Sequence, residues 1–322
     1  HQQGVPRMST SSTLAFAFPG QGSQSVGMLA EAATRPEVRD TFAEAGEALG
    51  FDLWQLVQAG PEAELNRTDN TQPAMLAAGV ALWRVWCAEG GPQPALLAGH
   101  SLGEYTALVA AGALGFADAV RLVAERGRLM QAAVPAGAGA MAALLGLDEP
   151  AVREACAEAA QGEVVEAVNL NAPGQIVIAG AATAVARAVE AAKARGAKRA
   201  VVLPVSVPSH CALMRPAAER LAERLAAVDL RTPSIPVLHN ADVARHAEAD
   251  AIRAALVRQL HSPVRWIETI EAMAAAGITT VVECGPGKVL AGMNKRIVKG
   301  LAAPTMPDLS ALLAVLADQK GA

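Results

Sequence analysis

The sequence predicts an α/β protein in which a large domain, built on a parallel sheet, is interrupted by a smaller domain. The chain has 322 residues, 52% of them hydrophobic, so it can bury one large core and a smaller insert. Short apolar runs that read as buried strands are followed by glycine-rich turns or loops. Between residues 140 and 205 the pattern of strands and helices changes, which indicates the insert.

The first part of the chain reads as strands and helices in turn. Residues 14–18 are an apolar run that ends at Pro19-Gly20, which predicts a buried strand entering a tight loop. Helical patterns then follow from residue 28 to residue 89, with a break at Gly60-Pro61. The next expected elements are a strand at 94–99 and helices at 102–111 and 116–133.

The insert reads as a β-α-β-β-α-β unit, which is the ferredoxin-like pattern. Pro150 suits the first turn of its first helix, and Gly196 suits the end of its second helix. The strands are expected at 140–147, 164–169, 175–179 and 199–205, and the helices at 149–160 and 183–195.

The pattern of the large domain resumes after Pro208. It includes a strand at 278–282, and the chain from residue 303 onward reads as weakly helical. The domain boundaries that we expect are 8–134 and 207–310 for the two parts of the large domain and 135–206 for the small domain, with 1–7, ahead of Met8, as a tag remnant.

Charge and cysteine content exclude several classes of protein. A net charge of −4 gives no overall attraction to nucleic acid or to an anionic membrane. No apolar run is long enough for a transmembrane helix, and no signal peptide is evident. The four cysteines lack metal-binding spacing, so we expect reduced thiols, no metal site and a cytoplasmic location.

A Gly-x-Ser-x-Gly motif places Ser101 directly after a predicted strand and directly before a predicted helix. This is the nucleophile elbow, in which small residues at Gly99 and Gly103 avoid collisions within a sharp turn. It predicts an α/β-hydrolase-like large domain with Ser101 as the acyl-accepting nucleophile at a helix N-terminus. The alternative is a plain strand-to-helix turn, and the motif does not separate hydrolases from transferases.

A serine nucleophile needs a base, and the chain has six histidines. The candidate is His210, where the insert returns to the large domain; the alternative is a structural histidine. No carboxylate lies within a few residues of His210, so a backbone or amide oxygen could orient it instead. The others read as a tag residue (His1), a solvated residue (His246), structural residues (His239, His261) and a neighbour of Ser101 that points away (His100).

Arg126 lies on the largely apolar face of the predicted helix 116–133, whereas its charged neighbours form a separate polar stripe. A guanidinium in apolar surroundings needs an anionic partner, and its planar fork suits a carboxylate. The functional interpretation is a site for a carboxylate on the acyl substrate. The alternatives are an internal salt bridge and a side chain that extends to solvent.

Seven motifs occur along the chain: Phe18–Gln24 (FPGQGSQ), Thr71–Ala74 (TQPA), Gly99–Glu104 (GHSLGE), Glu125–Gly127 (ERG), Asn169–Gln175 (NLNAPGQ), Pro204–His210 (PVSVPSH) and Glu283–Gly287 (ECGPG). In this order they resemble the malonyl-CoA:acyl carrier protein transacylases of bacterial fatty-acid synthesis. The resemblance runs from about residue 14 to residue 299, and the ordered set is far more specific than any single motif.

The resemblance implies a function and a role for each candidate residue. Malonyl-CoA would donate the acyl group and acyl carrier protein would accept it, without a cofactor, and we expect a monomer. Ser101 would carry the malonyl group as an ester, and His210 would act first as base and then as acid. The other implied roles are an oxyanion hole from the backbone N–H groups of Gln21 and Leu102, a carboxylate site at Arg126, and a backbone carbonyl of Gln259 that orients the histidine.

Two rival functions stay open at this point. One is a serine esterase or thioesterase that passes the acyl group to water, and the other is a non-catalytic module that binds acyl carrier protein. Two basic groups are candidates for docking an acidic carrier, with an ordinary solvated surface as the alternative. They are Lys288, Lys295, Arg296 and Lys299 near the last motif, and Arg187, Lys193, Lys198 and Arg199 on the insert.

Overall fold

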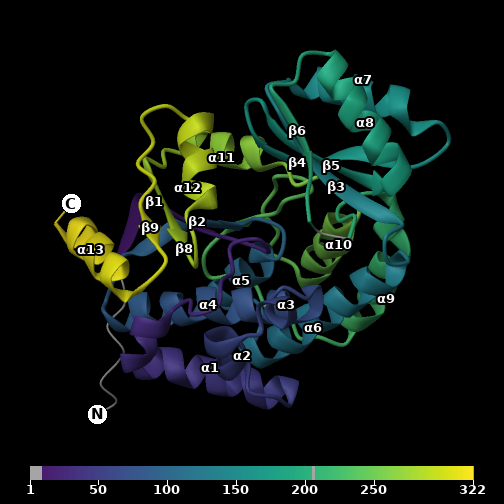
Figure 1. Cartoon of the computed structure of the whole chain (residues 1–322). Helices are drawn as coiled ribbons and strands as arrows, with labels where there is room; N and C mark the ends of the chain where they lie inside the picture. The colour runs from purple at the N-terminus through teal and green to yellow at the C-terminus, as the bar shows by residue number, and fades with distance from the viewer. Residues whose placement is uncertain (1–8, 205–206, 322) are drawn as a thin grey trace, which may run out of the picture.

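The computed structural model describes residues 9–204 and 207–321 and has two separate sheets (Figure 1). A parallel sheet of five strands has the order β7-β2-β1-β8-β9, and an antiparallel sheet of four strands has the order β4-β5-β3-β6. The expected mixed α/β protein with a parallel sheet is therefore confirmed.

The parallel sheet is formed by β1 (Thr10–Phe18), β2 (Gln93–Gly99), β7 (Val237–Leu238), β8 (Thr280–Cys284) and β9 (Thr305–Met306). Strand β1 begins earlier than expected because its first residues are exposed Ser and Thr, which carry no apolar signal. Its next residues alternate between the two faces. Phe16 and Phe18 pack into one core, and Ala15 and Ala17 pack into another.

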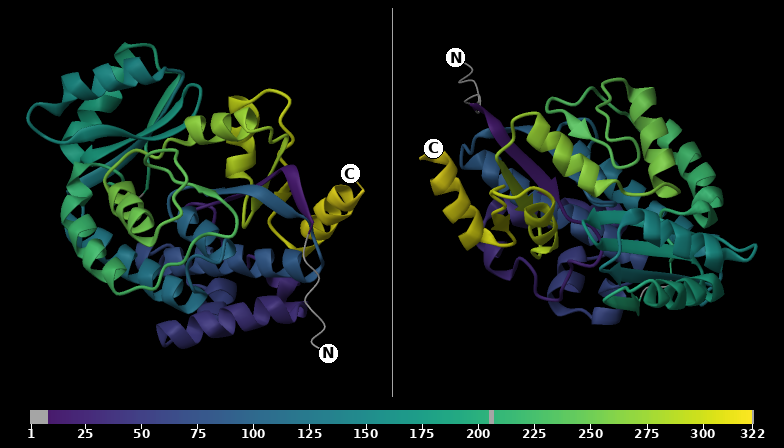
Figure 2. Two further views of the ribbon diagram at one scale, coloured as in Figure 1. Left: turned by 180° about the vertical axis from the view of Figure 1, so that it is seen from behind. Right: turned by 90° about the horizontal axis from the view of Figure 1, so that it is seen from above.

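Helices cover both faces of this sheet (Figure 2). The larger core lies on the Phe16 side, against α4 and its neighbours, and the smaller core lies against α11. The helices around this sheet are α1 (Pro36–Leu49), α2 (Leu53–Ala59), α3 (Glu62–Leu65), α4 (Thr68–Ala88), α5 (Gly103–Ala110), α6 (Phe116–Ala133), α9 (Arg215–Ala226), α10 (Ala249–Leu260), α11 (Trp266–Ala275), α12 (Val289–Ile297) and α13 (Leu309–Lys320), with short 3-10 turns at Ala30–Thr34 and Ala212–Met214.

The antiparallel sheet follows the β-α-β-β-α-β order that the sequence predicts. Its elements are β3 (Gly139–Leu145), α7 (Glu149–Ala160), β4 (Val165–Ala172), β5 (Gln175–Ala181), α8 (Ala182–Ala194) and β6 (Arg199–Val202). Helices α7 and α8 cover one face of the sheet (Figure 1). The opposite face packs Met141 and Val168 near Cys211. Main-chain hydrogen bonds between β4 and Val264 tie this sheet to the rest of the molecule.

Three sequence expectations differ from the structure or lie beyond its description. Strand β6 ends at Val202 rather than continuing through residue 204, and residues 205–206 are outside the described part of the chain. The proposed tag at residues 1–7 is also outside it. The C-terminal segment that reads as weakly helical forms α13, which continues past residue 310, the expected end of the large domain. This helix buries Leu312 and Leu316 in the larger core.

Within residues 9–204 and 207–321, no helix combines the length and the apolar character that crossing a bilayer requires.

The join between β2 and α5 permits only glycine at two positions. A Cβ at Gly99 would lie 1.8 Å from the carbonyl oxygen of Gly103, and a Cβ at Gly103 would lie 2.0 Å from the carbonyl oxygen of Phe18. Both obstacles are backbone atoms of packed elements, so they cannot move aside cheaply. The glycines of the predicted elbow are therefore a packing requirement.

We expect Gly99→Ala to destabilise the protein by about 3 kcal/mol or more, because the strand and the helix must separate to admit the methyl group. Gly292→Ala is the matched control: it adds a methyl group within α12 where no atom lies within 4 Å, so it should be neutral or stabilise by about 0.5–1 kcal/mol. Urea unfolding measures both. Equal midpoints for Gly99→Ala and the unchanged protein would contradict this packing argument.

Candidate active site

Ser101 occupies the turn between β2 and α5 in a left-handed backbone conformation, with φ of 53°. A residue other than glycine adopts this conformation only where the surrounding structure holds it. The turn leaves Ser101 partly exposed while its neighbour Leu102 is buried. The predicted nucleophile elbow is therefore formed in full, with the serine hydroxyl beside the start of a helix.

His210 lies next to Ser101 in space, although 109 residues separate them in the chain. Its Nε2 is 2.7 Å from Ser101 Oγ, and its Nδ1 is 2.7 Å from the backbone carbonyl oxygen of Gln259. Because a carbonyl only accepts, Nδ1 carries the proton and Nε2 is free to accept the serine proton. No carboxylate of the described residues bonds the imidazole, so the backbone carbonyl orients the ring.

The environment of His210 keeps the ring neutral. Burial, and secondly the positive charge of Arg126, lower the pKa of His210 to about 3. The imidazole is therefore uncharged near neutral pH, and this is the protonation state that a base requires.

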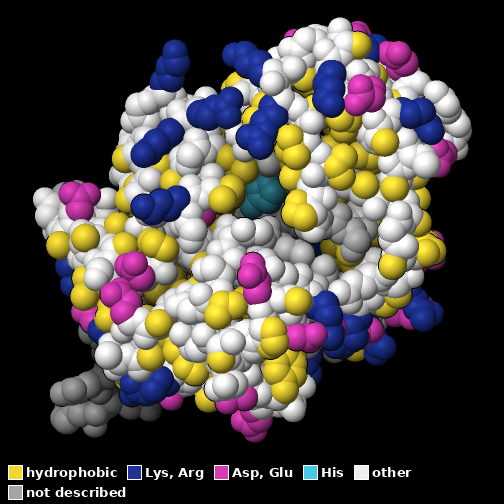
Figure 3. Space-filling view, in the orientation of Figure 1, with side chains coloured by type: hydrophobic (Ala, Val, Ile, Leu, Met, Phe, Trp, Pro, Cys, Tyr) yellow, Lys and Arg dark blue, Asp and Glu magenta, His cyan; other side chains and the backbone are white. Residues whose placement is uncertain are grey.

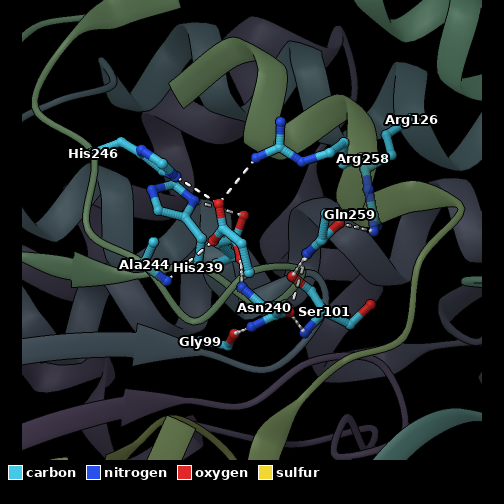
Figure 4. Close-up of polar contacts among 11 residues, drawn as sticks. Gly99, Ser101, Arg126, His239, Asn240, Ala244, His246, Arg258 and Gln259 are labelled. Carbon is cyan, nitrogen blue, oxygen red and sulfur yellow. Dashed lines mark hydrogen bonds and ion pairs between the residues drawn. The ribbon is translucent and has the colours of Figure 1, made fainter. Parts of the chain in front are cut away.

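Arg126 projects from α6 into the interior and is 1% exposed. Its two terminal nitrogens donate to amide oxygens. One donates to Gln72 Oε1 at 2.9 Å, and the other donates to Gln259 Oε1 at 3.0 Å, a contact that Figure 4 shows. Among the described residues it has no salt-bridge partner, and its Nε lacks a hydrogen bond. The internal salt bridge that the sequence left open for Arg126 is therefore absent among the described residues, and its buried charge remains available to an anion.

Ser101, His210 and Arg126 line one cavity of about 420 Å³. Figure 3 shows it as a hollow between the two sheets, with a histidine at its floor and Lys and Arg side chains along its upper rim. Apolar side chains form much of the remaining wall: Met130, Met141, Leu203, Pro204 and Val207. The cavity therefore brings together a serine hydroxyl, a neutral imidazole that can accept its proton and one buried cation.

Gln21 and Leu102 both line this cavity. The backbone N–H group of neither residue donates a hydrogen bond to another described residue. The Gln21 side chain is held by Thr68 Oγ1 at 3.2 Å, which steadies the loop after β1. Two unengaged N–H groups beside a serine nucleophile have the chemistry that an oxyanion requires.

Sequence reasoning missed two residues and part of the function of a third. Gln72 holds Arg126, Asn240 contacts the backbone of the elbow, and the side chain of Gln259 binds both Arg126 and Ser101. The available signals were the polar Gln72 within an apolar helical run and Asn240 two residues after a short apolar run.

Three other histidines of the described residues bond partners other than Ser101. His100 Nε2 lies 2.7 Å from Asn171 Oδ1, and His239 pairs with buried Glu104. His246 was expected to be solvated but is half-buried and bonds Asp242 Oδ2 at 2.7 Å. In the described part of the chain no group of three or more His, Cys, Asp or Glu could hold a metal ion.

Comparisons with known proteins agree with this geometry. The acyl transferase domain family matches residues 15–310. The malonyl CoA-acyl carrier protein transacylase of Escherichia coli K12 is 60% identical over 303 residues, which cover 94% of this chain and 98% of that protein. The protein of the same name from Bacillus subtilis is 47% identical, over 92% of this chain and 94% of that protein.

Solved structures give the same result. An acyl carrier protein S-malonyltransferase from Vibrio cholerae superposes with a TM-score of 0.93 at 58% identity, covering 94% of this chain and 99% of that one. A malonyl-transacylase solved in complex with its type II PKS acyl-carrier protein has a TM-score of 0.94 at 56% identity, covering 95% and 99%. The chain belongs to the acyl transferase domain family and, within it, to the malonyl CoA-acyl carrier protein transacylases.

Proposed function

We propose that the protein transfers the malonyl group from malonyl-CoA to the pantetheine thiol of acyl carrier protein through an ester of Ser101. The observation that carries the proposal is the cavity in which the Ser101–His210 pair stands beside a buried Arg126 without a carboxylate partner. Relatives that bear the name malonyl CoA-acyl carrier protein transacylase support the same acyl group and acceptor.

The first half-reaction forms the ester. Ser101 Oγ attacks the thioester carbonyl carbon while His210 Nε2 takes the hydroxyl proton, and the carbonyl oxygen becomes an oxyanion. The N–H groups of Gln21 and Leu102 donate to that oxyanion, an effect worth ~2.7–4 kcal/mol per donor. The C–S bond then breaks, and His210 returns its proton to the leaving thiolate of CoA.

The second half-reaction reverses these steps with a new thiol. His210 removes the proton from the pantetheine thiol of the carrier, the sulfur attacks the ester carbonyl, and Ser101 leaves with the proton from His210. No cofactor enters this sequence, because the base and the donors belong to the chain.

Arg126 selects the acyl group by charge. A buried guanidinium without an anionic partner is unfavourable. The free carboxylate of a malonyl group supplies that partner. That carboxylate also offsets the charge that depresses the pKa of His210, so a correctly bound substrate makes the base stronger.

The finer description of the fold is also a proposal. The nucleophile elbow and parallel sheet support an α/β-hydrolase-like large domain over residues 8–134 and 207–310. The strand order β4-β5-β3-β6 supports a ferredoxin-like small domain over residues 135–206. A monomer is likewise proposed, and four free cysteines support a cytoplasmic location.

The carrier is proposed to approach the basic rim of the hollow in Figure 3. Lys288, Lys295 and Lys299 are exposed around α12 and form no salt bridge with a described residue. On the insert, Arg187 and Lys193 are paired with Glu163 and Glu190, and only Lys198 and Arg199 form no salt bridge with a described residue. The group around α12 is therefore the better candidate for an acidic partner.

Incubation with malonyl-CoA should add one malonyl group to Ser101, detected by intact-protein and peptide mass spectrometry. Ser101→Ala should remove the adduct, because the attacking oxygen is gone. Holo acyl carrier protein should discharge the adduct much faster than water does. Absence of the adduct would falsify the enzyme proposal, and equal discharge by water would indicate a thioesterase.

Arg126→Ala should lower kcat/KM for malonyl transfer by about 100-fold or more, because the substrate carboxylate loses a buried charged partner. Transfer of an uncharged acetyl group from acetyl-CoA should be spared or improved. Arg128→Ala is the matched control on the same helix: its side chain is exposed and bonds Glu125, so both activities should stay unchanged. An equal loss of both activities in Arg126→Ala would disprove the charge selection.

The pH dependence follows from the low pKa of His210, about 3. His210 must be neutral to act as a base, and it stays neutral until the pH falls close to its pKa. We therefore expect kcat/KM for malonyl-CoA to stay level from pH 7 to about 5. Stopped-assay kinetics across this range measure it, with circular dichroism at each pH to verify folding. An acid limb near the ordinary histidine pKa of 6.5 would contradict the assigned environment.

A further inference from the structure

Asn240 is a fully buried amide behind the Ser101 elbow, outside the cavity lining. Its Oδ1 accepts from the backbone N–H of Ser101 at 2.8 Å, and its Nδ2 donates to the backbone carbonyl of Gly99 at 2.7 Å (Figure 4). One side chain therefore bridges the last residue of β2 and the strained residue of the turn.

The position of Asn240 follows from the sheet. Strand β7 pairs in parallel with β2, with Val237 opposite Leu97 and Leu238 opposite Ala98. Asn240 comes two residues after β7, where β2 has ended and its ladder stops. Its amide supplies a donor and an acceptor to backbone groups that would otherwise be buried without partners.

The surroundings permit only one orientation of this amide. Oδ1 faces two donors, Ser101 N–H and Gln259 Nε2 at 3.2 Å, and Nδ2 faces an acceptor. The backbone N–H of Asn240 donates to Glu104 Oε1 at 2.5 Å, and the other oxygen of Glu104 lies 3.1 Å from His239 Nδ1. Since Glu104 stands in the first turn of α5, the helix that follows the nucleophile also fixes Asn240.

These contacts set the direction of two peptide groups. Asn240 holds the N–H of Ser101, and Gln259 Nε2 holds its carbonyl oxygen at 2.7 Å. In a trans peptide the carbonyl and the following N–H point in opposite directions, so a carbonyl held on the buried side turns the Leu102 N–H toward the cavity.

We propose that Asn240 is a positioning residue for the acyl transfer: it holds the Ser101 turn so that the hydroxyl meets His210 and the Leu102 N–H meets the oxyanion. This inference rests on the proposed function at Ser101. Asn240 does not line the cavity, so it acts on the rate of acylation and not on the binding of malonyl-CoA.

Asn240→Asp tests this proposal with almost no change of shape. A protonated carboxyl keeps one acceptor for Ser101 N–H and one donor for the Gly99 carbonyl, whereas an ionised carboxylate places an oxygen against that carbonyl. Burial and the Glu104 carboxylate raise the pKa of the introduced group. His239 adjoins Glu104, and its ring lies 5.1 Å from that of His246. His246 and Arg258 both pair with Asp242, so the charges of these groups also act on the introduced carboxyl.

The rate of malonyl-Ser101 formation is measured by rapid quench and mass spectrometry between pH 5 and pH 8. At pH 8 we expect Ser101 of Asn240→Asp to be acylated about 10- to 100-fold more slowly than in the unchanged protein. A small misplacement of reacting groups lowers a rate by this much. At pH 5 its rate should approach that of the unchanged protein. The malonyl-CoA concentration for half-maximal rate should not change at either pH.

Two comparisons separate positioning from folding. Asn294→Asp alters another fully buried asparagine, which bonds Trp266 Nε1 away from the elbow, and it should lower stability without a pH-dependent loss of acylation. Asn240→Ala cannot restore either contact, so it should stay slow at pH 5, where Asn240→Asp recovers. If Asn240→Asp unfolds at high pH, the acylation rates of Asn240→Asp and Asn240→Ala at pH 5 still show whether the two hydrogen bonds position Ser101.

The outcomes for the two proposals are distinct. If the unchanged protein forms no adduct on Ser101, the proposed function fails. If it forms the adduct and both Asn240 variants acylate at the unchanged rate, or if Asn240→Asp and Asn240→Ala are equally slow at every pH, the positioning role of Asn240 is wrong.

Discussion

The left-handed backbone of Ser101 is the constraint on which the rest of the site depends. A serine at φ of 53° is held in place because Gly99 and Gly103 let β1, β2 and α5 approach within distances that no side chain permits. That approach brings the serine hydroxyl, the start of α5 and the loop after β1 to one point. The positions of the Ser101 hydroxyl and of both candidate oxyanion donors follow from this one close contact.

A second constraint is the buried positive charge of Arg126. Its guanidinium donates to two neutral amide oxygens, from Gln72 and Gln259, which orient it without cancelling its charge. The unliganded protein bears the desolvation cost of this charge, and under the proposed function the carboxylate of the substrate offsets it. Burial and, secondly, the same charge lower the pKa of His210, so under the proposed function Arg126 affects both the selection of the acyl group and the strength of the base.

Gln259 joins these two constraints. Its backbone carbonyl orients His210, and its side chain bonds Arg126, Ser101 and Asn240. The network contains amides where many serine enzymes carry a carboxylate. An amide both donates and accepts hydrogen bonds and carries no charge. These side chains therefore orient their partners without cancelling the attraction of Arg126 for an anion.

The sequence by itself determined the order of strands and helices up to about residue 204, the elbow at Ser101 and the unusual placement of Arg126; it did not locate β7, which carries Asn240 to the elbow. These features are local: a strand shows its apolar run, a sharp turn shows its glycines, and a helix shows its faces within a few neighbouring residues. For the base, residue chemistry left His210 and a structural alternative open, and only the ordered family motifs favoured the catalytic role. The tertiary structure decided which atoms meet. His210 reaches Ser101 across 109 residues, Asn240 reaches it across 139, and the side chain of Gln259 binds three partners at once. Such contacts depend on how β7, α10 and the two sheets pack, and no local pattern of residues encodes that packing.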